Sequence, residues 1–278
     1  MRLAGYIDQK FEAPETWAQA YRQAGYGAAY SPVGLDASDT IVAAYVEAAR
    51  RADLVIAEVG AWSNPIDPDS LKAAQAIEGC RRNLDLADRL GARCCVNITG
   101  SRNPAKWDGP YHTNFSDETF ELIVQSTRAI VDAVKPRRTF YALETMPWIF
   151  PSAPDEYLAL LRAIDRPSVA VHLDPVNMIN SPARSYHTGD FIRECFAKLG
   201  PFIRSCHAKD IILRETLTVH LDECRPGTGV LDYSTYLREL SKLDPDTSLC
   251  LEHITPEEYP IAAAHLHEVA RQNNLRFL

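Results

Sequence analysis

Short apolar runs alternate with longer amphipathic segments from one end of the chain to the other. The short runs have the length and composition of buried strands in a parallel sheet. Eight strands are therefore predicted, at Leu3–Ile7, Gly27–Tyr30, Leu54–Val59, Cys94–Thr99, Thr139–Thr145, Val169–Asp174, Ile203–Ala208 and Ser248–His253.

The longer segments repeat their apolar residues with helical spacing, and several begin with residues that favour a helix start. Ser116 stands before Asp117 and Glu118, and Thr255 precedes Pro256 with Glu258 three residues after the threonine. Eight helices are predicted, at Pro14–Ala24, Asp39–Ala52, Ser70–Leu90, Asp117–Val134, Asp155–Ile164, Gly189–Leu199, Asp232–Leu243 and Pro256–Asn273.

Strands that alternate with helices form right-handed βαβ units around a parallel sheet. Eight such units fit a closed (β/α)8 TIM barrel better than an open sheet, and no Gly/Ser-rich linker divides the chain. We therefore expect one barrel domain over residues 1–278, with its active site at the carboxyl ends of the strands. Two connections on that face, Gly100–Asn114 and Lys209–Val230, are long, and such loops often determine specificity.

Four residues able to bind a metal ion each end a different predicted strand: Glu144, Asp174, His207 and Glu252. In a barrel they would converge on one rim, where three carboxylates and one imidazole suit a hard or borderline divalent cation. By strand alternation, each shares its face with residues suited to a barrel interior. Each alone has a plainer interpretation, since a strand-end carboxylate usually caps a helix and Asp before Pro favours a turn. Together the four indicate an enzyme with a metal site.

The composition excludes some classes of function. A formal charge of −8 over 278 residues argues against non-specific binding of nucleic acid. Seven cysteines form an odd set without a CxxC pair, which indicates a reducing compartment and neither a disulfide framework nor a zinc ribbon. The first residues lack the apolar core of a signal peptide, and no apolar stretch approaches the length of a membrane span. We expect a cytoplasmic protein that binds neither nucleic acid nor membrane.

Five short motifs follow one another in the order ALET, HLDPVN, CHAKD, RPGTGVLDY and LEH. In this order they resemble the xylose-isomerase-like TIM-barrel superfamily of sugar and sugar-phosphate isomerases and epimerases. The resemblance spans most of the chain and is strongest from Thr139 to His253. It implies a small carbohydrate substrate and one divalent ion, with Mn²⁺ first among Mn²⁺, Mg²⁺, Co²⁺ and Zn²⁺. The ligands it implies are Glu144, Asp174, His207 and Glu252.

In ketose 3-epimerases and related isomerases of this superfamily, two glutamate ligands also act as acid and base, and these positions match Glu144 and Glu252. A divalent ion that coordinates a carbonyl and a neighbouring hydroxyl acidifies the C–H between them. One carboxylate would remove this proton, and a second group would return it to the same carbon or to the adjacent one. The chain departs from the epimerases at Asn177, where those enzymes often carry a substrate-binding His. An amide binds a sugar hydroxyl but carries no proton near neutral pH.

Two basic residues near the seventh strand are expected to contact substrate. By parity Lys209 returns to the face of His207 beyond the strand, where it would polarise a carbonyl or hold an anionic group. The alternative is a solvated Lys209 paired with Asp210. Arg225 matches a region in which relatives place a substrate-contacting arginine.

Three further residues are candidates for the substrate-binding rim. Glu58 ends the third strand and, with the following Trp62, would form a wall for a sugar ring. Trp107 and His112 lie in the long fourth loop, where an aromatic side chain would stack on a sugar or anchor the loop.

The leading hypothesis is a divalent-metal-dependent sugar isomerase or epimerase that abstracts a proton next to a metal-bound carbonyl. A lyase of the same superfamily is the first alternative, either a keto-inositol dehydratase or an enzyme that eliminates the aglycone of a 3-keto glycoside. An endonuclease IV-like role would need a trinuclear cluster with more histidines. A non-catalytic barrel subunit is the remaining class. Barrels of this kind often form homo-oligomers, but no segment of the sequence defines an interface.

Overall fold

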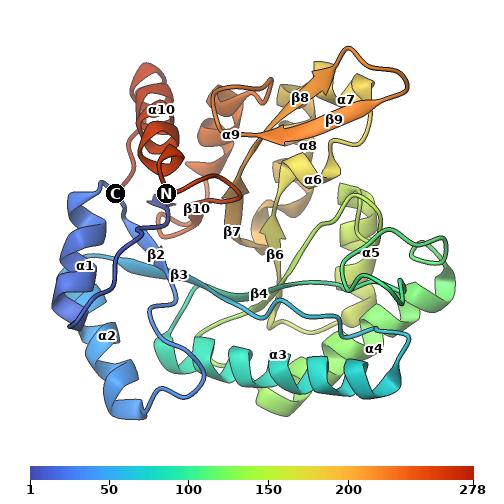
Figure 1. The fold of residues 1–278 in the computed structure, drawn as a ribbon, viewed down its shortest axis with the longest axis horizontal. Coiled ribbons are helices and arrows are strands. Elements are labelled where there is room, and N and C mark those ends of the chain that lie inside the picture. Colours follow the sequence, from blue (N-terminus) through green and yellow to red (C-terminus); the bar gives the residue numbers. More distant parts are fainter.

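The computed structural model describes residues 1–278 and contains a closed barrel of eight parallel strands (Figure 1). Around the barrel the strands follow the order β1, β10, β7, β6, β5, β4, β3, β2. Their bounds are β1 Arg2–Ala4, β2 Ala28–Tyr30, β3 Val55–Gly60, β4 Cys94–Ile98, β5 Tyr141–Glu144, β6 Val169–Leu173, β7 Ile203–Ala208 and β10 Ser248–Leu251. All eight predicted strands are present, so the predicted (β/α)8 TIM barrel is confirmed.

A ring of helices surrounds the barrel (Figure 1). Their apolar faces pack against the outside of the strands and form the main hydrophobic core. The predicted helices correspond to α1 Pro14–Gln23, α2 Asp39–Arg51, α3 Ser70–Leu90, α4 Asp117–Val134, α5 Pro154–Ile164, α8 Thr188–Leu199, α9 Tyr233–Leu240 and α10 Glu258–Gln272. None of the helices combines the length and the apolar character that a membrane crossing requires.

Of the two predicted helix starts, the one at Ser116 is confirmed and the one at Thr255 is not. Ser116 caps α4, because its side chain accepts a hydrogen bond from the Thr119 amide at 3.2 Å. Thr255 does not cap α10, which begins only at Glu258. The Thr255 amide nevertheless donates to the Glu258 carboxylate at 3.0 Å, and this contact stabilises the turn before the helix.

Small apolar side chains fill the inside of the barrel. One interior group consists of Ala4, Ala28, Ala57 and Cys250, and another of Cys94, Val96, Ala142 and Ala170. Ala142 and Ala170 are the residues expected to share strand faces with Glu144 and Asp174. The alternation predicted for β5 and β6 therefore holds, and it directs both carboxylates inward at the rim.

The long connection after β7 is not a plain loop. It contains an antiparallel hairpin, β8 Asp210–Arg214 and β9 His220–Cys224, that stands out from the barrel (Figure 1). Two short helices, α6 Pro175–Met178 and α7 Pro182–Tyr186, follow β6 in a segment for which no helix was predicted. All of these elements lie on the carboxyl-terminal side of the strands from which they continue.

Asp210 holds the base of the hairpin together. One of its carboxylate oxygens accepts hydrogen bonds from the amides of Gly227 and Gly229, each at 3.0 Å. The other accepts from the amide of Leu231 at 2.8 Å. Glycine is needed at position 229, because a Cβ there would lie 2.3 Å from the carbonyl oxygen of Ile211. The PGTG turn is therefore a structural closure of the hairpin.

Arg2 ties the opposite, amino-terminal end of the barrel. Its guanidinium is buried and pairs with Asp53 at 2.8 Å and with Asp246 at 2.7 Å. It also donates to the backbone carbonyl of Asp53 at 2.6 Å. Because Asp53 precedes β3 and Asp246 precedes β10, one side chain links three strands of the closed sheet.

Candidate metal centre

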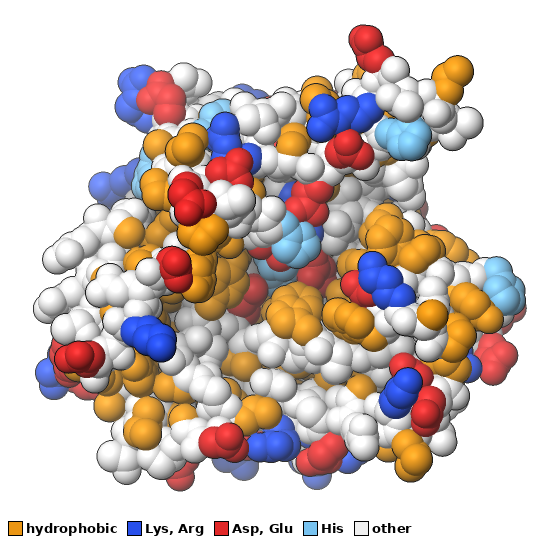
Figure 2. All heavy atoms as spheres, in the orientation of Figure 1, with side chains coloured by type: hydrophobic (Ala, Val, Ile, Leu, Met, Phe, Trp, Pro, Cys, Tyr) orange, Lys and Arg blue, Asp and Glu red, His pale blue; other side chains and the backbone are white.

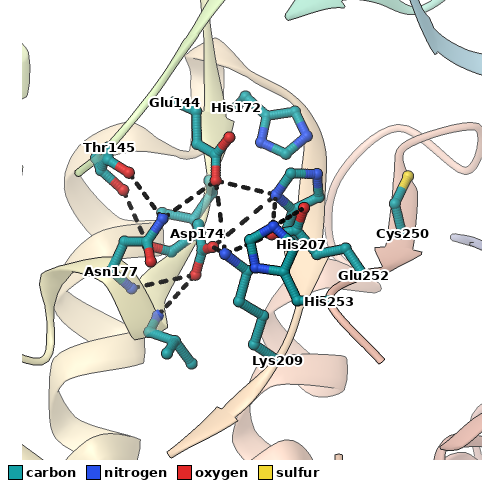
Figure 3. A network of polar contacts seen from close by, with 12 residues as sticks. Glu144, Thr145, His172, Asp174, Asn177, His207, Lys209, Cys250, Glu252 and His253 are labelled. Atoms are coloured by element: carbon teal, nitrogen blue, oxygen red, sulfur yellow. Dashed lines mark hydrogen bonds and ion pairs between the residues drawn. The ribbon is translucent and has the colours of Figure 1, made fainter. Parts of the chain in front are cut away.

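The carboxyl ends of β5, β6, β7 and β10 bring four predicted residues together (Figure 3). One side-chain atom from each of Glu144, Asp174, His207 and Glu252 lies within 4.8 Å of the others. His207 Nδ1 is 3.1 Å from Glu144 Oε1, 2.8 Å from Glu252 Oε1 and 3.9 Å from Asp174 Oδ2. The imidazole nitrogen thus faces three carboxylates contributed by three other strands or strand ends.

Asp174, in the LDP motif, both caps a helix and belongs to the candidate metal cluster. Its Oδ1 caps α6, accepting from the amides of Val176 at 2.9 Å and Asn177 at 3.2 Å, and Pro175 occupies the first helical turn. Its Oδ2 is buried and lies 2.9 Å from Lys209 Nζ and 3.9 Å from His207 Nδ1. The cap on Oδ1 fixes the carboxylate so that Oδ2 points into the cluster.

Glu252 Oε1 is also buried, and it lies 2.8 Å from His207 Nδ1 and 2.5 Å from Lys209 Nζ. Buried carboxylate oxygens gathered around an imidazole nitrogen are the donors expected of a divalent-metal site. These residues therefore fit the divalent ion that the sequence resemblance implies.

The charges of the cluster oppose the effect of its burial. Burial would lower the pKa of His207, but Glu252 and Glu144 outweigh it and raise this pKa well above 6.5. Burial would likewise raise the pKa of Glu252, but His207 and Lys209 lower it well below its usual value. Both residues are therefore charged in the absence of a metal ion.

Lys209 is part of the same cluster. Its side chain is only 2% exposed, and Nζ lies 2.5 Å from Glu252 Oε1 and 2.9 Å from Asp174 Oδ2. Burial lowers its pKa, but Asp174 and Glu252 raise it well above 10.5. The alternative of a solvated Lys209 paired with Asp210 is wrong, because Asp210 instead binds backbone amides of the hairpin.

A second polar layer lies beneath the four residues. His172 Nε2 is 2.8 Å from Glu58 Oε2, and His207 Nε2 is 3.5 Å from Glu58 Oε1. The Ser205 hydroxyl donates to Glu58 at 3.3 Å. Burial would raise the pKa of Glu58, but His172 and His207 outweigh it and lower this pKa to about 2. A buried carboxylate therefore supports the ring nitrogen of His207 that faces away from the cluster.

A register shift in β3 explains why Glu58 points into the barrel. Ala29 pairs with Ile56, whereas the next residue, Tyr30, pairs with Glu58, so Ala57 is an extra residue in β3. Strict alternation would place Glu58 on the outer face with Ile56, which belongs to the core between barrel and helices. The bulge turns the carboxylate inward. Glu58 therefore lines the cavity at its floor, and its contact with substrate stays a prediction.

A cavity of about 1220 Å³ opens above the cluster. Figure 2 shows the hollow, with acidic and histidine side chains at its depth and hydrophobic side chains around it. Glu144, Lys209 and Glu252 lie at its floor. Its walls include Trp62, Trp107, Trp148, Met146, Ile179, Val219, Leu221, Glu223, His253 and Tyr259.

Of the remaining residues predicted to bind substrate, two line the cavity and two do not. Trp107 and Asn177 line the cavity, and Asn177 donates to Glu144 Oε1 at 3.2 Å and to the Thr145 carbonyl at 2.9 Å. Arg225 does not line it, because its guanidinium lies 3.7 Å from Glu258 and donates to the Pro226 carbonyl. His112 also lies outside, exposed beside Tyr111 on the fourth loop. The structure therefore places Arg225 and His112 outside the lining of this cavity, and their contact with substrate stays a prediction.

Glu223 and His253 were not predicted as site residues. His253 Nδ1 lies 3.0 Å from Glu223 Oε1 across the mouth of the cavity, and His253 has a positive φ of 55°. Glu223 lies in β9, a strand that the composition of this connection does not predict. His253 directly follows Glu252 in the LEH motif, and this adjacency was the available clue.

The family model described as Xylose isomerase-like TIM barrel matches residues 18–273. No curated protein matches the chain. Among solved structures, a probable 3-DHS dehydratase from Bacillus anthracis is 17% identical, with a TM-score of 0.71 over 96% of this chain and 97% of that one. D-psicose 3-epimerase from Clostridium cellulolyticum is 16% identical, with a TM-score of 0.65 over 99% and 98%. Endonuclease IV from Thermus thermophilus is 13% identical, with a TM-score of 0.73 over 98% and 100%. These similarities show a shared fold, which by itself selects no reaction.

Proposed function

Because the chain belongs to the xylose isomerase-like TIM barrel family, we propose that it is a divalent-metal-dependent isomerase or epimerase of a small carbohydrate. The observation that carries this proposal is the convergence of Glu144, Asp174, His207 and Glu252 at the floor of an open cavity. Carboxylates beside a divalent-metal site are best suited to proton abstraction from the carbon next to a carbonyl.

The four clustered residues would hold the ion, with Mn²⁺ as the first expectation. A bound divalent ion would act as a Lewis acid: it would polarise a substrate carbonyl and stabilise the negative charge that develops on its oxygen. Asp174 Oδ2, Glu252 Oε1 and His207 Nδ1 support this assignment, because all three point to one place. Asp174 and His207 are assigned to holding the ion alone.

Glu144 and Glu252 are assigned the proton transfers. They come from β5 and from the end of β10, and they flank His207 Nδ1 at 3.1 Å and 2.8 Å. One carboxylate would take the proton from the carbon next to the carbonyl, and the other would return one from its own side. Asn177 fixes Glu144 through a 3.2 Å hydrogen bond and leaves the proton transfer to the two carboxylates.

Lys209 is assigned to the substrate oxygen. Its ammonium group is fixed by Asp174 and Glu252 and lines the cavity at the level of the acid and base residues. A buried, preorganised cation stabilises negative charge that develops during proton abstraction. Lys209 therefore orients the carbonyl and offsets this charge from the β7 side.

A lyase is the second candidate. Elimination needs one base and a leaving group rather than two proton carriers on opposite faces. Asn177 stands where the epimerases often have a histidine, and its amide is already engaged by Glu144 and the Thr145 carbonyl. The same residues at the cavity floor would then remove the proton, and the resulting intermediate would lose a β substituent.

Solvent exchange tests the proposed function. The Mn²⁺-loaded protein would be incubated in D₂O with ketoses, 3-keto sugars and keto-inositols, and deuterium incorporation followed by NMR. We expect exchange at the carbon next to the carbonyl of at least one substrate class, with product analysis separating isomerisation from elimination. Glu144→Gln and Glu252→Gln should each slow this exchange ~100-fold or more, whereas the exposed Glu12→Gln should not. Absence of exchange throughout the panel would contradict the proposal.

A further inference from the structure

The cavity extends well beyond its charged floor, and one wall of its upper part is apolar. We propose that this upper part binds an apolar, aglycone-like group of an uncharged, non-phosphorylated carbohydrate. This inference rests on the proposed function, since it places the sugar portion over the metal centre. The apolar wall is defined here by Trp62, Trp148, Ile179, Val219 and Leu221.

The size of the cavity is the first argument. Its volume of about 1220 Å³ exceeds the ~300–1,000 Å³ of typical pockets for drug-sized ligands. A monosaccharide is smaller than such a ligand and would occupy only part of this space. The substrate therefore has a second portion, or the upper cavity stays filled with water against apolar side chains.

The nature of the lining is the second argument. Trp62 lies directly above the cluster, with its ring centroid 6.5 Å from that of His207 and an interplanar angle of 33°. A sugar held at the floor would therefore lie against this indole. Val219 and Leu221 from the hairpin, and Ile179 after α6, continue the wall away from the floor. Val219 is 51% exposed and Trp62 is 45% exposed, so both have surface available for an apolar partner.

Charge is the third argument, and it disfavours a phosphorylated substrate. Five carboxylates line the cavity, from Glu58, Asp108, Glu144, Glu223 and Glu252, against two cations, Lys106 and Lys209. Lys209 is already bound by Asp174 and Glu252, and Lys106 Nζ lies 3.6 Å from Asp108. Arg225 is turned toward Glu258. Carboxylates thus outnumber cations in the lining, and a phosphate dianion in the upper cavity would face the carboxylate of Glu223.

Equilibrium binding tests this assignment without turnover. Calorimetry on the Mn²⁺-loaded protein would compare phenyl β-D-glucopyranoside, methyl β-D-glucopyranoside and glucose 6-phosphate. We expect the phenyl glycoside to bind at least ~10-fold more tightly than the methyl glycoside, because the two differ only in the apolar group. We expect glucose 6-phosphate to bind more weakly than either. Equal affinities for the two glycosides, tighter binding of the phosphate, or no binding of any of the three would overturn the inference.

Variants of the apolar wall separate a specific site from general adhesion of a phenyl group. Val219→Asp should lower the affinity for the phenyl glycoside about 10-fold and leave that for the methyl glycoside within about 2-fold. Ile261→Ser, on the exposed face of α10, is the matched control and should change neither affinity. Because no chemistry is measured, a protein that fails the D₂O exchange test can still show this preference. Conversely, deuterium exchange by a protein that binds the two glycosides equally would leave the proposed function intact and overturn only the inference of an apolar aglycone-like group.

Discussion

Glu58 lies 2.8 Å from His172 and 3.5 Å from His207, and so supports the candidate metal centre from beneath. A carboxylate on the far nitrogen of a ligating imidazole fixes the ring and raises its basicity. We expect Glu58→Gln to weaken Mn²⁺ binding about 10- to 100-fold, measured by electron paramagnetic resonance of the free ion. Glu12→Gln is the control, and an unchanged affinity in Glu58→Gln would show that Glu58 only fills space.

Lys209→Met should separate metal binding from catalysis. The ammonium competes with a cation for Asp174 Oδ2 and Glu252 Oε1, at 2.9 Å and 2.5 Å. Its removal should tighten Mn²⁺ binding about tenfold or more, since a nearby like charge is lost. The same variant should lose about 100-fold in D₂O exchange, because the substrate oxygen loses its cation. The exposed Lys242→Met should leave both quantities unchanged; parallel loss of both in Lys209→Met would instead indicate a structural role.

Arg2→Met should destabilise the barrel without affecting the metal centre. The variant removes both ion pairs and the hydrogen bond to the Asp53 carbonyl at the amino-terminal end. We expect a loss of about 1–3 kcal/mol in the free energy of unfolding, less than for a fully buried pair because both aspartates reach solvent. Urea denaturation measures this loss, and Mn²⁺ affinity serves as the internal control. A midpoint equal to that of the unmodified protein would contradict it.

The contribution of Arg2 should also depend on pH. The hydrogen bond from Arg2 lowers the pKa of Asp53 below its ordinary value of 3.8. A carboxyl group whose pKa is depressed by folding adds stability above its unfolded pKa, and this stability is lost as the pH falls through the folded value. The difference in urea midpoint between the unmodified protein and Arg2→Met should therefore be full at pH 6 and shrink below about pH 4. A difference independent of pH would contradict the role of Asp53.

Asp210→Ala should loosen the hairpin. The carboxylate accepts from the amides of Gly227, Gly229 and Leu231, and its loss leaves these donors without their partner. We expect faster hydrogen exchange across residues 209–231 and cleavage of the hairpin by trypsin after Arg214. Asp222→Ala, whose carboxylate pairs only with Arg214 on the exposed face of the hairpin, is the matched control. Equal protection in the two variants would show that Asp210 does not close the hairpin.

The sequence predicted the barrel strands well because their apolar runs and intervening helices follow regular periods. Glu144 and Asp174 were placed correctly in space for the same reason, since alternation within β5 and β6 is undisturbed. The inward direction of Glu58 could not be predicted, because it depends on a bulge that breaks the alternation and that no local residue pattern marks. The direction of Arg225 toward Glu258 could not be predicted, because it depends on how the PGTG turn is held by Asp210, a contact between distant residues. The hairpin itself mixes charged and apolar residues and has no long apolar run to reveal it.

The closure of the hairpin by Asp210 has an evolutionary consequence. The metal ligands belong to the barrel strands or their ends, whereas Val219, Leu221 and Glu223 belong to an excursion that leaves and rejoins the chain at one tied point. Such an excursion can be exchanged or lengthened without moving the strands on either side of it. On the proposed assignment of the hairpin to substrate binding, substrate preference can therefore diverge by replacement of this single module while the barrel rim beneath it stays unchanged.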